Sequence, residues 1–365
     1  MDLPCGAIAR DDKFFCRKSD QEKVWRYLKN DHVILSGPRW VGKSSLAARL
    51  VRDAAANGFK KAELIDLEGC DSADEAVKCI EKVFPASAFE TVVNAADGLL
   101  KSATKVRPRM STADGQTFSL ELTAKETAPD RADWKLKAES LKQRLLPQKL
   151  LICLDEFSVF LSKILQADRA AGESFVGWLR GWRLNPIPTN CRFIFSGSIG
   201  LNSLLDSQKL TTYFNDCLPY SLGPFPRPDA LEMMATVCRN NEMEAQTEVL
   251  ENICDRIGWL SPYFLNLMLT EAANQARYER SPQETAIRLV DIKGAYANLL
   301  ANRGQFTHWH QRLLRDLKEP RLGLALKILG VIAKTDQGLT HQQLRARVSR
   351  KIKNDGDFAN ILTPA

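Results

Sequence analysis

The stretch Gly37-Pro38-Arg39-Trp40-Val41-Gly42-Lys43-Ser44, followed by a second hydroxyl at Ser45, decides how this chain folds. Its spacing is the P-loop (Walker A) pattern G-x-x-x-x-G-K-[ST]. The glycines allow a tight turn, and the backbone N–H groups of such a loop point at an anion. We therefore expect residues 37–45 to cradle the phosphates of a nucleotide, with Lys43 on the β- and γ-phosphates and Ser44 on Mg²⁺.

The residues on either side of this loop support the same interpretation. The apolar run His32-Val33-Ile34-Leu35-Ser36 is suited to a buried parallel strand. The run 45–56 is rich in helix formers and is closed by Asn57-Gly58. Strand, glycine turn and helix is the order that phosphate binding requires. The alternative, a glycine turn that carries a lysine by chance, does not account for both flanks.

The composition bounds the class of protein. The chain has 365 residues, 44% of them hydrophobic and 26% charged, with a net charge of +7, which is typical of two or three soluble globular domains. No apolar run approaches the roughly 18 residues that span a membrane. The N-terminus lacks a signal-peptide design. The 9 cysteines are scattered without a C-x-x-C pair, which favours reduced thiols in the cytoplasm.

A second motif follows in Lys149-Leu150-Leu151-Ile152-Cys153-Leu154-Asp155-Glu156-Phe157. An apolar strand that ends in Asp-Glu is the Walker B pattern, and its continuous apolar run predicts burial on both faces of a parallel sheet. We expect this strand to neighbour the P-loop strand. Asp155 would hold Mg²⁺ through water, and Glu156 would orient or deprotonate an attacking water. The alternative is a core strand followed by an acidic helix N-terminus.

A third buried strand ends in small polar residues, in Cys191-Arg192-Phe193-Ile194-Phe195-Ser196-Gly197-Ser198. At its tip, Ser196 and Ser198 are candidates to contact the γ-phosphate or the water, and a plain turn is the alternative. Residues 86–135 are less regular, and we interpret them as an insertion, with a small β-hairpin, in an α/β core. A helix is expected over 134–146.

The composition changes at Leu222. Residues 223–228 are rich in proline and predict a linker that is not helical. Four helices are expected after it, over 229–239, 242–257, 262–278 and 282–300. The sequence therefore predicts a P-loop core over 1–221 and a separate helical unit over 222–305.

The last segment, 306–365, begins with an apolar helix over 322–333. A capping box at Thr340 to Gln343 opens a second, basic helix, and a third helix starts near Phe358. That order is typical of a helix-turn-helix or winged helix. The sequence ends at Ala365, where a recognition helix and a wing are expected, so we interpret it as the start of a truncated winged-helix-like domain. Residues 340–353 are the candidate surface for double-stranded DNA.

Taken together, these motifs resemble the archaeal-type ATPases of the STAND class, which are relatives of AAA+ proteins. Arg17 matches the arginine of a hydrophobic-hydrophobic-Gly-Arg-Glu box, although Cys16 and Lys18 replace the glycine and the glutamate. Residues 258–264 resemble the G-G-x-P-[FY] segment of the lid, in which Pro262 would lie near the bound nucleotide. The resemblance implies an α/β P-loop NTPase fold, a parallel sheet flanked by helices, with a helical lid.

The same resemblance implies an ATP- and Mg²⁺-dependent switch that acts in regulation, defence or DNA-related processes and turns over slowly without a partner. A DNA-binding regulator or loader, in which ATP binding only sets the conformation, is the second hypothesis. A small-molecule kinase fits the Asp-Glu pair and the large lid less well. A protein partner or self-association is also expected, and Arg180, Arg183 and Arg192 are candidate arginine fingers.

Overall fold

The computed structural model describes residues 8–9, 14–85, 133–185, 190–197, 200–302, 311, 313–314, 317, 321–335 and 339–348. Most of the predicted insertion (86–132), Ser198 and the predicted third helix near Phe358 lie outside these residues. In the part of the chain that is described, no helix has the length and apolar character needed to cross a bilayer.

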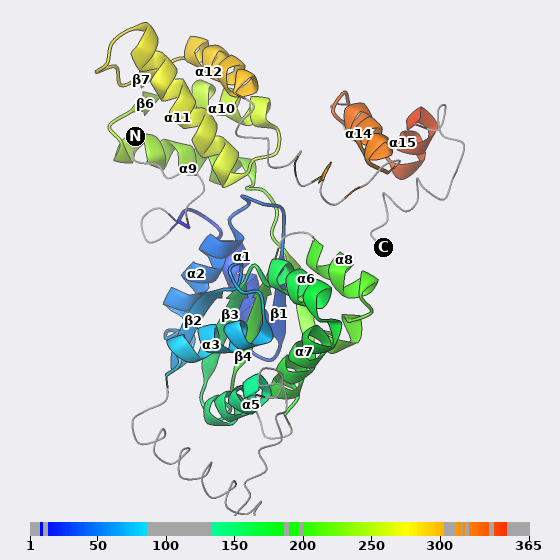
Figure 1. Cartoon of the computed structure of the whole chain (residues 1–365). Coiled ribbons are helices and arrows are strands. Elements are labelled where there is room, and N and C mark those ends of the chain that lie inside the picture. Colours follow the sequence, from blue (N-terminus) through cyan, green and yellow to red (C-terminus); the bar gives the residue numbers. More distant parts are fainter. Residues whose placement is uncertain are drawn as a thin grey trace, which may run out of the picture.

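A parallel sheet of five strands forms the centre of the first part of the chain (Figure 1). Its strands are β1 (His32–Ser36), β2 (Lys61–Asp66), β3 (Leu150–Asp155), β4 (Arg192–Ser196) and β5 (Cys217–Ser221). Every residue of β1 and β3 is buried, as their continuous apolar runs predict. The predicted parallel sheet is confirmed, and β5 is a strand that the sequence pattern did not reveal.

The order of the strands is β2-β3-β4-β1-β5. The prediction that the Walker B strand neighbours the P-loop strand is therefore wrong, because β4 lies between β1 and β3. Val33 pairs with Ile194 on one side of β4, and Ile152 pairs with Phe193 on the other. The sequence gives no local signal for the connection that places β4 between β1 and β3. The consequence of this placement is that the tip with Ser196 sits between the P-loop and Asp155.

Helices cover both faces of the sheet. One face packs against α1 (Lys18–Leu28) and α2 (Lys43–Asp53), in a core that includes Val24, Leu46 and Ile194. The other face packs a larger core that includes Phe157 and Phe195. The described helices of this part of the chain also include α3 (Ala73–Val83), α5 (Asp133–Leu145), α6 (Phe157–Ala167), α7 (Arg169–Arg183) and α8 (Gly200–Ser207).

Four further helices form a second unit with its own apolar core. They are α9 (Arg227–Asn240), α10 (Thr247–Ile257), α11 (Pro262–Glu279) and α12 (Leu289–Ala301). The second and fourth begin later than predicted, because β6 (Glu244–Ala245) and β7 (Ala286–Ile287) pair as two short parallel strands before them. Strands of two residues are too short to show a hydrophobic period.

The last described helices are α14 (Arg321–Ile332) and α15 (His341–Val348), which pack through Leu324, Ile328, Leu344 and Val348. The predicted capping box forms before α15. The Thr340 backbone N–H donates to Gln343 Oε1 at 2.9 Å, and the Gln343 N–H donates to Thr340 Oγ1 at 3.3 Å.

A buried ion pair joins the end of α7 to the start of β5. Arg183 is 0% exposed at its side chain and donates from Nε to Asp216 Oδ2 at 2.6 Å. Its guanidinium also lies over the rings of Phe195 and Phe214. Because Arg183 is fully buried, it cannot act as an arginine finger on a second copy.

We expect Asp216→Ala to lower the free energy of unfolding by about 3–5 kcal/mol, because it leaves the Arg183 charge buried without its counterion. Chemical denaturation followed by circular dichroism measures the effect. The control is Asp255→Ala, which breaks the exposed pair with Arg227. If both variants shifted the denaturation midpoint equally, the buried Arg183–Asp216 pair would contribute no more to stability than the exposed pair.

Candidate nucleotide-binding site

The P-loop connects β1 to α2 and leaves the sheet at its carboxyl edge. Lys43 is 6% exposed, and its ammonium donates to the carbonyl oxygens of Gly37 and Pro38 at 3.0 and 3.1 Å. Gly42 caps α2 with φ +100°, a left-handed conformation that favours glycine. The N-terminus of α2 therefore directly follows the loop, and its backbone N–H groups favour an anion there.

Gly37 is needed for close packing. A Cβ at this position would lie 2.7 Å from the carbonyl oxygen of Leu222, which is backbone and cannot easily move. The Leu222 N–H donates to the Ser36 carbonyl at 2.8 Å. The start of the P-loop thus touches the segment through which the chain leaves β5 for the helical unit.

Trp40, in the middle of the loop, is held by the start of α11. Its ring stacks on Tyr263 with centroids 4.2 Å apart and an interplanar angle of 16°. The hydroxyl of Ser261, a residue that is 0% exposed, donates to the Trp40 carbonyl at 2.7 Å. Pro262 lies beside Gly42, 4.0 Å from the position of a Cβ there. The structure therefore brings the predicted lid segment directly onto the loop.

Arg17 supports the loop from another side. It is 5% exposed, and its guanidinium donates to the Val41 carbonyl at 2.9 Å and pairs with Asp20 at 3.3 Å. The same guanidinium lies 4.4 Å from the ring centre of Phe225. In this structure Arg17 contacts the backbone of the loop, and its predicted contact with the nucleotide remains a prediction.

The two acidic residues of Walker B follow β3 at the same edge of the sheet. Asp155 is 5% exposed, and its Oδ1 accepts from the Glu156 N–H at 3.0 Å. Burial and the Asp155 carboxylate raise the pKa of Glu156, and Lys43 and Arg39 partly offset this rise. The electrostatic influence of Lys43 on Glu156 links the two motifs across β4.

The hydroxyl residues differ in their surroundings. Ser196 is 0% exposed, and its hydroxyl has no hydrogen-bond partner among the described residues. Ser45, the second hydroxyl of the P-loop, accepts from the Ala9 N–H at 3.0 Å. Ser44 lies in the first turn of α2 and is half-buried. Ser198 lies outside the described residues, so its role remains a prediction.

Two of the candidate arginine fingers lie away from this edge. Arg183 is buried against Asp216, as described above. Arg192 begins β4, at the opposite end from Ser196, and donates to the Leu28 carbonyl at 3.1 Å. The guanidinium of Arg180 lies 6.0 Å from the ring centre of Tyr213.

The sequence placed Trp40 in the loop 37–45 and Ser261 in the lid segment 258–264, but it gave no signal for the contact between them or for Glu68. Trp40 occupies a variable position of the P-loop pattern, and Ser261 was only part of the lid motif. Glu68 follows β2, and its carboxylate lies 3.9 Å from the guanidinium of Arg39. Each contact joins residues that are distant in sequence, which a local pattern does not reveal.

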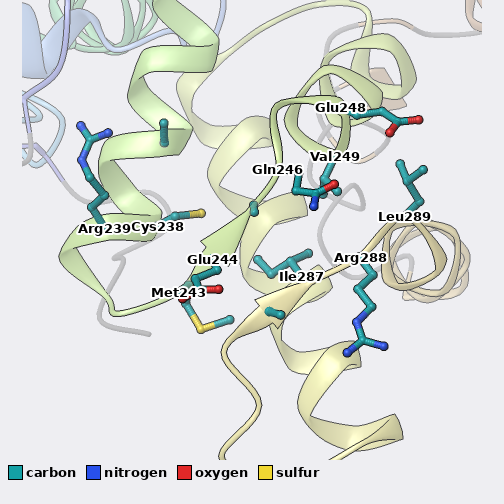
Figure 2. Close-up of a pocket in the computed structure, with 13 residues that line it drawn as sticks. Cys238, Arg239, Met243, Glu244, Gln246, Glu248, Val249, Ile287, Arg288 and Leu289 are labelled. Carbon is teal, nitrogen blue, oxygen red and sulfur yellow. The ribbon is translucent and has the colours of Figure 1, made fainter.

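A separate cavity of about 670 Å³ lies in the helical unit (Figure 2). Both short strands line it, together with Arg239, Arg288 and apolar residues that include Met243 and Ile287. None of its lining residues belongs to the P-loop or to Walker B. It is therefore distinct from the candidate nucleotide site.

The residues at the sheet edge fit a nucleotide with Mg²⁺. Lys43 presents a cation within the loop, and the buried Ser196 hydroxyl lacks a partner in the described residues. The Ser44 hydroxyl and the Asp155 carboxylate are oxygen donors, which Mg²⁺ prefers.

Comparison with solved structures shows the fold. The Walker-type ATPase PABY2304 of Pyrococcus abyssi superposes with a TM-score of 0.50 at 17% identity, over 97% of each chain. The ORC2 protein of Aeropyrum pernix in its ADP form superposes with a TM-score of 0.52 at 13% identity, over 96% of this chain and 87% of that one. No protein-family model and no curated protein matches the chain. The parallel sheet flanked by helices is therefore a P-loop NTPase fold.

We expect Tyr263→Ala to lower the free energy of unfolding by about 1–2 kcal/mol and to speed hydrogen exchange in residues 38–42, because the Trp40 ring loses its stacking partner. The matched control is Tyr278→Ala on the same helix, where the side chain is 86% exposed. If both variants had the same exchange rates in the loop, the contact between Trp40 and Tyr263 would not be holding it.

Proposed function

We propose that the chain binds ATP with Mg²⁺ between the loop 37–45 and the segment 258–264, hydrolyses it, and uses the nucleotide to set the position of the helical unit. The observation that carries this proposal is the convergence of Lys43, Glu156 and the Ser261–Trp40 contact at one edge of a P-loop NTPase sheet. The two structural neighbours are named as a Walker-type ATPase and as an ADP-bound protein, which supports a nucleotide function.

Each residue has a role that its position supports. Lys43 and the N-terminus of α2 would bind the phosphates, and Ser44 and Asp155 would hold the metal, Asp155 through water. Bound Mg²⁺ supplies charge neutralisation on the phosphate oxygens. Glu156 would position a water and accept its proton, and its raised pKa makes the carboxylate more basic. Ser196, at the tip of β4, would donate a hydrogen bond from its hydroxyl to the γ-phosphate or to that water.

The switch itself would consist of three parts, as the sequence suggested: a core over 1–221, a lid over 222–305, and the start of a winged-helix-like domain over 306–365. A change at the P-loop reaches the lid through Trp40, because Ser261 and Tyr263 both contact it. Such coupling between a ligand and two domain positions is the defining property of a nucleotide switch. STAND-like architecture is part of this proposal.

We expect Lys43→Ala to lower ATP affinity at least about 100-fold, since it removes the charged partner of the phosphates. Glu156→Gln should bind ATP with near-normal affinity and turn over at least about 100-fold more slowly, because the amide cannot accept a proton. Calorimetry and phosphate release measure the two effects. The exposed residues Lys60 and Glu81 provide the controls Lys60→Ala and Glu81→Gln. ATP binding by Lys43→Ala that equals the wild type would refute the proposed site.

A second candidate function is duplex DNA binding by the last helices. The observation that favours it is the helix pair α14–α15, in which α15 follows a capping box and carries the exposed residues Arg345 and Arg347. A basic helix after a short turn is the geometry that enters a major groove. In this function ATP would only set the conformation of the chain.

We expect Arg345→Glu combined with Arg347→Glu to weaken duplex binding and to reduce the slope of log affinity against log salt by about 2, one for each lost phosphate contact. Fluorescence anisotropy at several salt concentrations measures both quantities. Lys60→Glu combined with Lys82→Glu changes the net charge equally at exposed positions far from α15 in the sequence. The same loss in both pairs would indicate a general charge effect and would exclude a specific surface on α15.

A further inference from the structure

Two thiols meet beside the candidate nucleotide site. The Sγ atoms of Cys70 and Cys79 lie 3.6 Å apart. Cys70 lies in the loop 67–71 that follows β2, and Cys79 lies on α3. An ordinary disulfide has its sulfurs about 2.05 Å apart, so a movement of about 1.5 Å would join them. Of the two residues, Cys70 is buried and Cys79 is partly exposed.

The loop that carries Cys70 is attached to both motifs of the site. The Leu67 N–H donates to the Asp155 carbonyl at 3.1 Å. Glu68 pairs with Arg39 of the P-loop at 3.9 Å, and its charge also acts on Glu156. On the far side, the Lys163 ammonium of α6 donates to the Glu68 carbonyl and to Asp71, both at 2.8 Å. A displacement of Cys70 is therefore transmitted to Asp155 and Arg39.

We propose that Cys70 and Cys79 form a reversible, peroxide-sensitive disulfide that lowers the activity of the adjoining site. This is a modification site that the ATPase mechanism does not use. The effect on activity rests on the proposed function, whereas the formation of the disulfide does not.

The chemistry begins at Cys79, the more accessible thiol. The Cys79 thiol gives its proton to solvent, and its thiolate attacks hydrogen peroxide. The O–O bond breaks, and Cys79 becomes a sulfenic acid with release of a hydroxide, which takes up a proton to form the first water. The Cys70 sulfur then attacks the Cys79 sulfur, the S–OH bond breaks, and a water leaves as the S–S bond forms. Overall, two thiols and one hydrogen peroxide become one disulfide and two waters, so the sulfurs lose the two electrons that the peroxide gains.

The surroundings of Cys70 match its role as the second thiol. Burial, together with the neighbouring Cys79, raises the pKa of Cys70 to about 12, which keeps it protonated and slow to react with peroxide directly. Cys70 can still react with the sulfenic acid of Cys79, because an adjacent group reacts at a high effective concentration.

The first test maps the bond in the whole chain. The protein is treated with hydrogen peroxide, its remaining thiols are alkylated, and its peptides are identified by mass spectrometry. We expect a peptide pair linked through Cys70 and Cys79 that disappears on reduction. In Cys70→Ser, Cys79 should accumulate as a sulfenic acid that dimedone traps. Cys16→Ser removes the other partly exposed cysteine among the described residues and should leave the linked pair unchanged.

Full alkylation of both thiols after a treatment that oxidises Cys16 would overturn the proposal, and so would a linkage of Cys70 or Cys79 to a different cysteine. Thermal unfolding of each reduced variant shows that it is folded, so that a missing bond is not the result of a missing structure.

The second test measures ATP turnover before and after oxidation. We expect peroxide to lower wild-type turnover about tenfold, since catalysis depends on the placement of the reacting groups, and a reductant to restore it. Cys79→Ser should keep its turnover in peroxide. A linked pair with unchanged turnover would refute the coupling to the site. An absence of turnover in the reduced wild type would count against the ATPase proposal. The peptide map would still show whether Cys70 and Cys79 form a disulfide.

Discussion

The hydrogen bond from the Ser261 hydroxyl to the Trp40 carbonyl is the contact on which the arrangement of this molecule depends. Trp40 has φ +66°, a backbone conformation that is costly for a bulky residue and persists only when its surroundings hold it. Ser261 holds the carbonyl at 2.7 Å, and Tyr263 holds the ring. The shape of the P-loop is thus fixed partly by residues of the helical unit. We therefore propose that a ligand that changes the loop also acts on that unit.

The strand order supplies the second constraint. Because β4 separates β1 from β3, the P-loop and the Asp155-Glu156 pair stand on either side of the tip of β4. Both motifs therefore lie at the carboxyl edge of the sheet, where parallel sheets bind their ligands. Burial of Glu156 at this edge, together with the charge of Asp155, raises the pKa of Glu156. The fold therefore places a carboxylate of raised pKa beside the P-loop.

Much of this architecture could be predicted from the sequence, for identifiable reasons. The strands β1, β3 and β4 are continuous apolar runs, and the P-loop has a fixed spacing of residues with strict backbone requirements. The capping box at Thr340 is a local hydrogen-bond pattern, and it forms as predicted. Strand order, the short strands β6 and β7, and the edge strand β5 were not predictable, because they depend on tertiary pairing. The contact of Ser261 with Trp40 spans 221 residues, and no local pattern reports such a contact.

Hydrogen exchange of the whole chain, with and without a non-hydrolysable ATP analogue and Mg²⁺, tests most directly whether the P-loop is coupled to the helical unit. We expect protection to change together in residues 37–45 and in residues 258–265, and both changes to vanish in Lys43→Ala. A change confined to residues 37–45, with unaltered exchange at 258–265, would contradict a P-loop that is coupled to the helical unit.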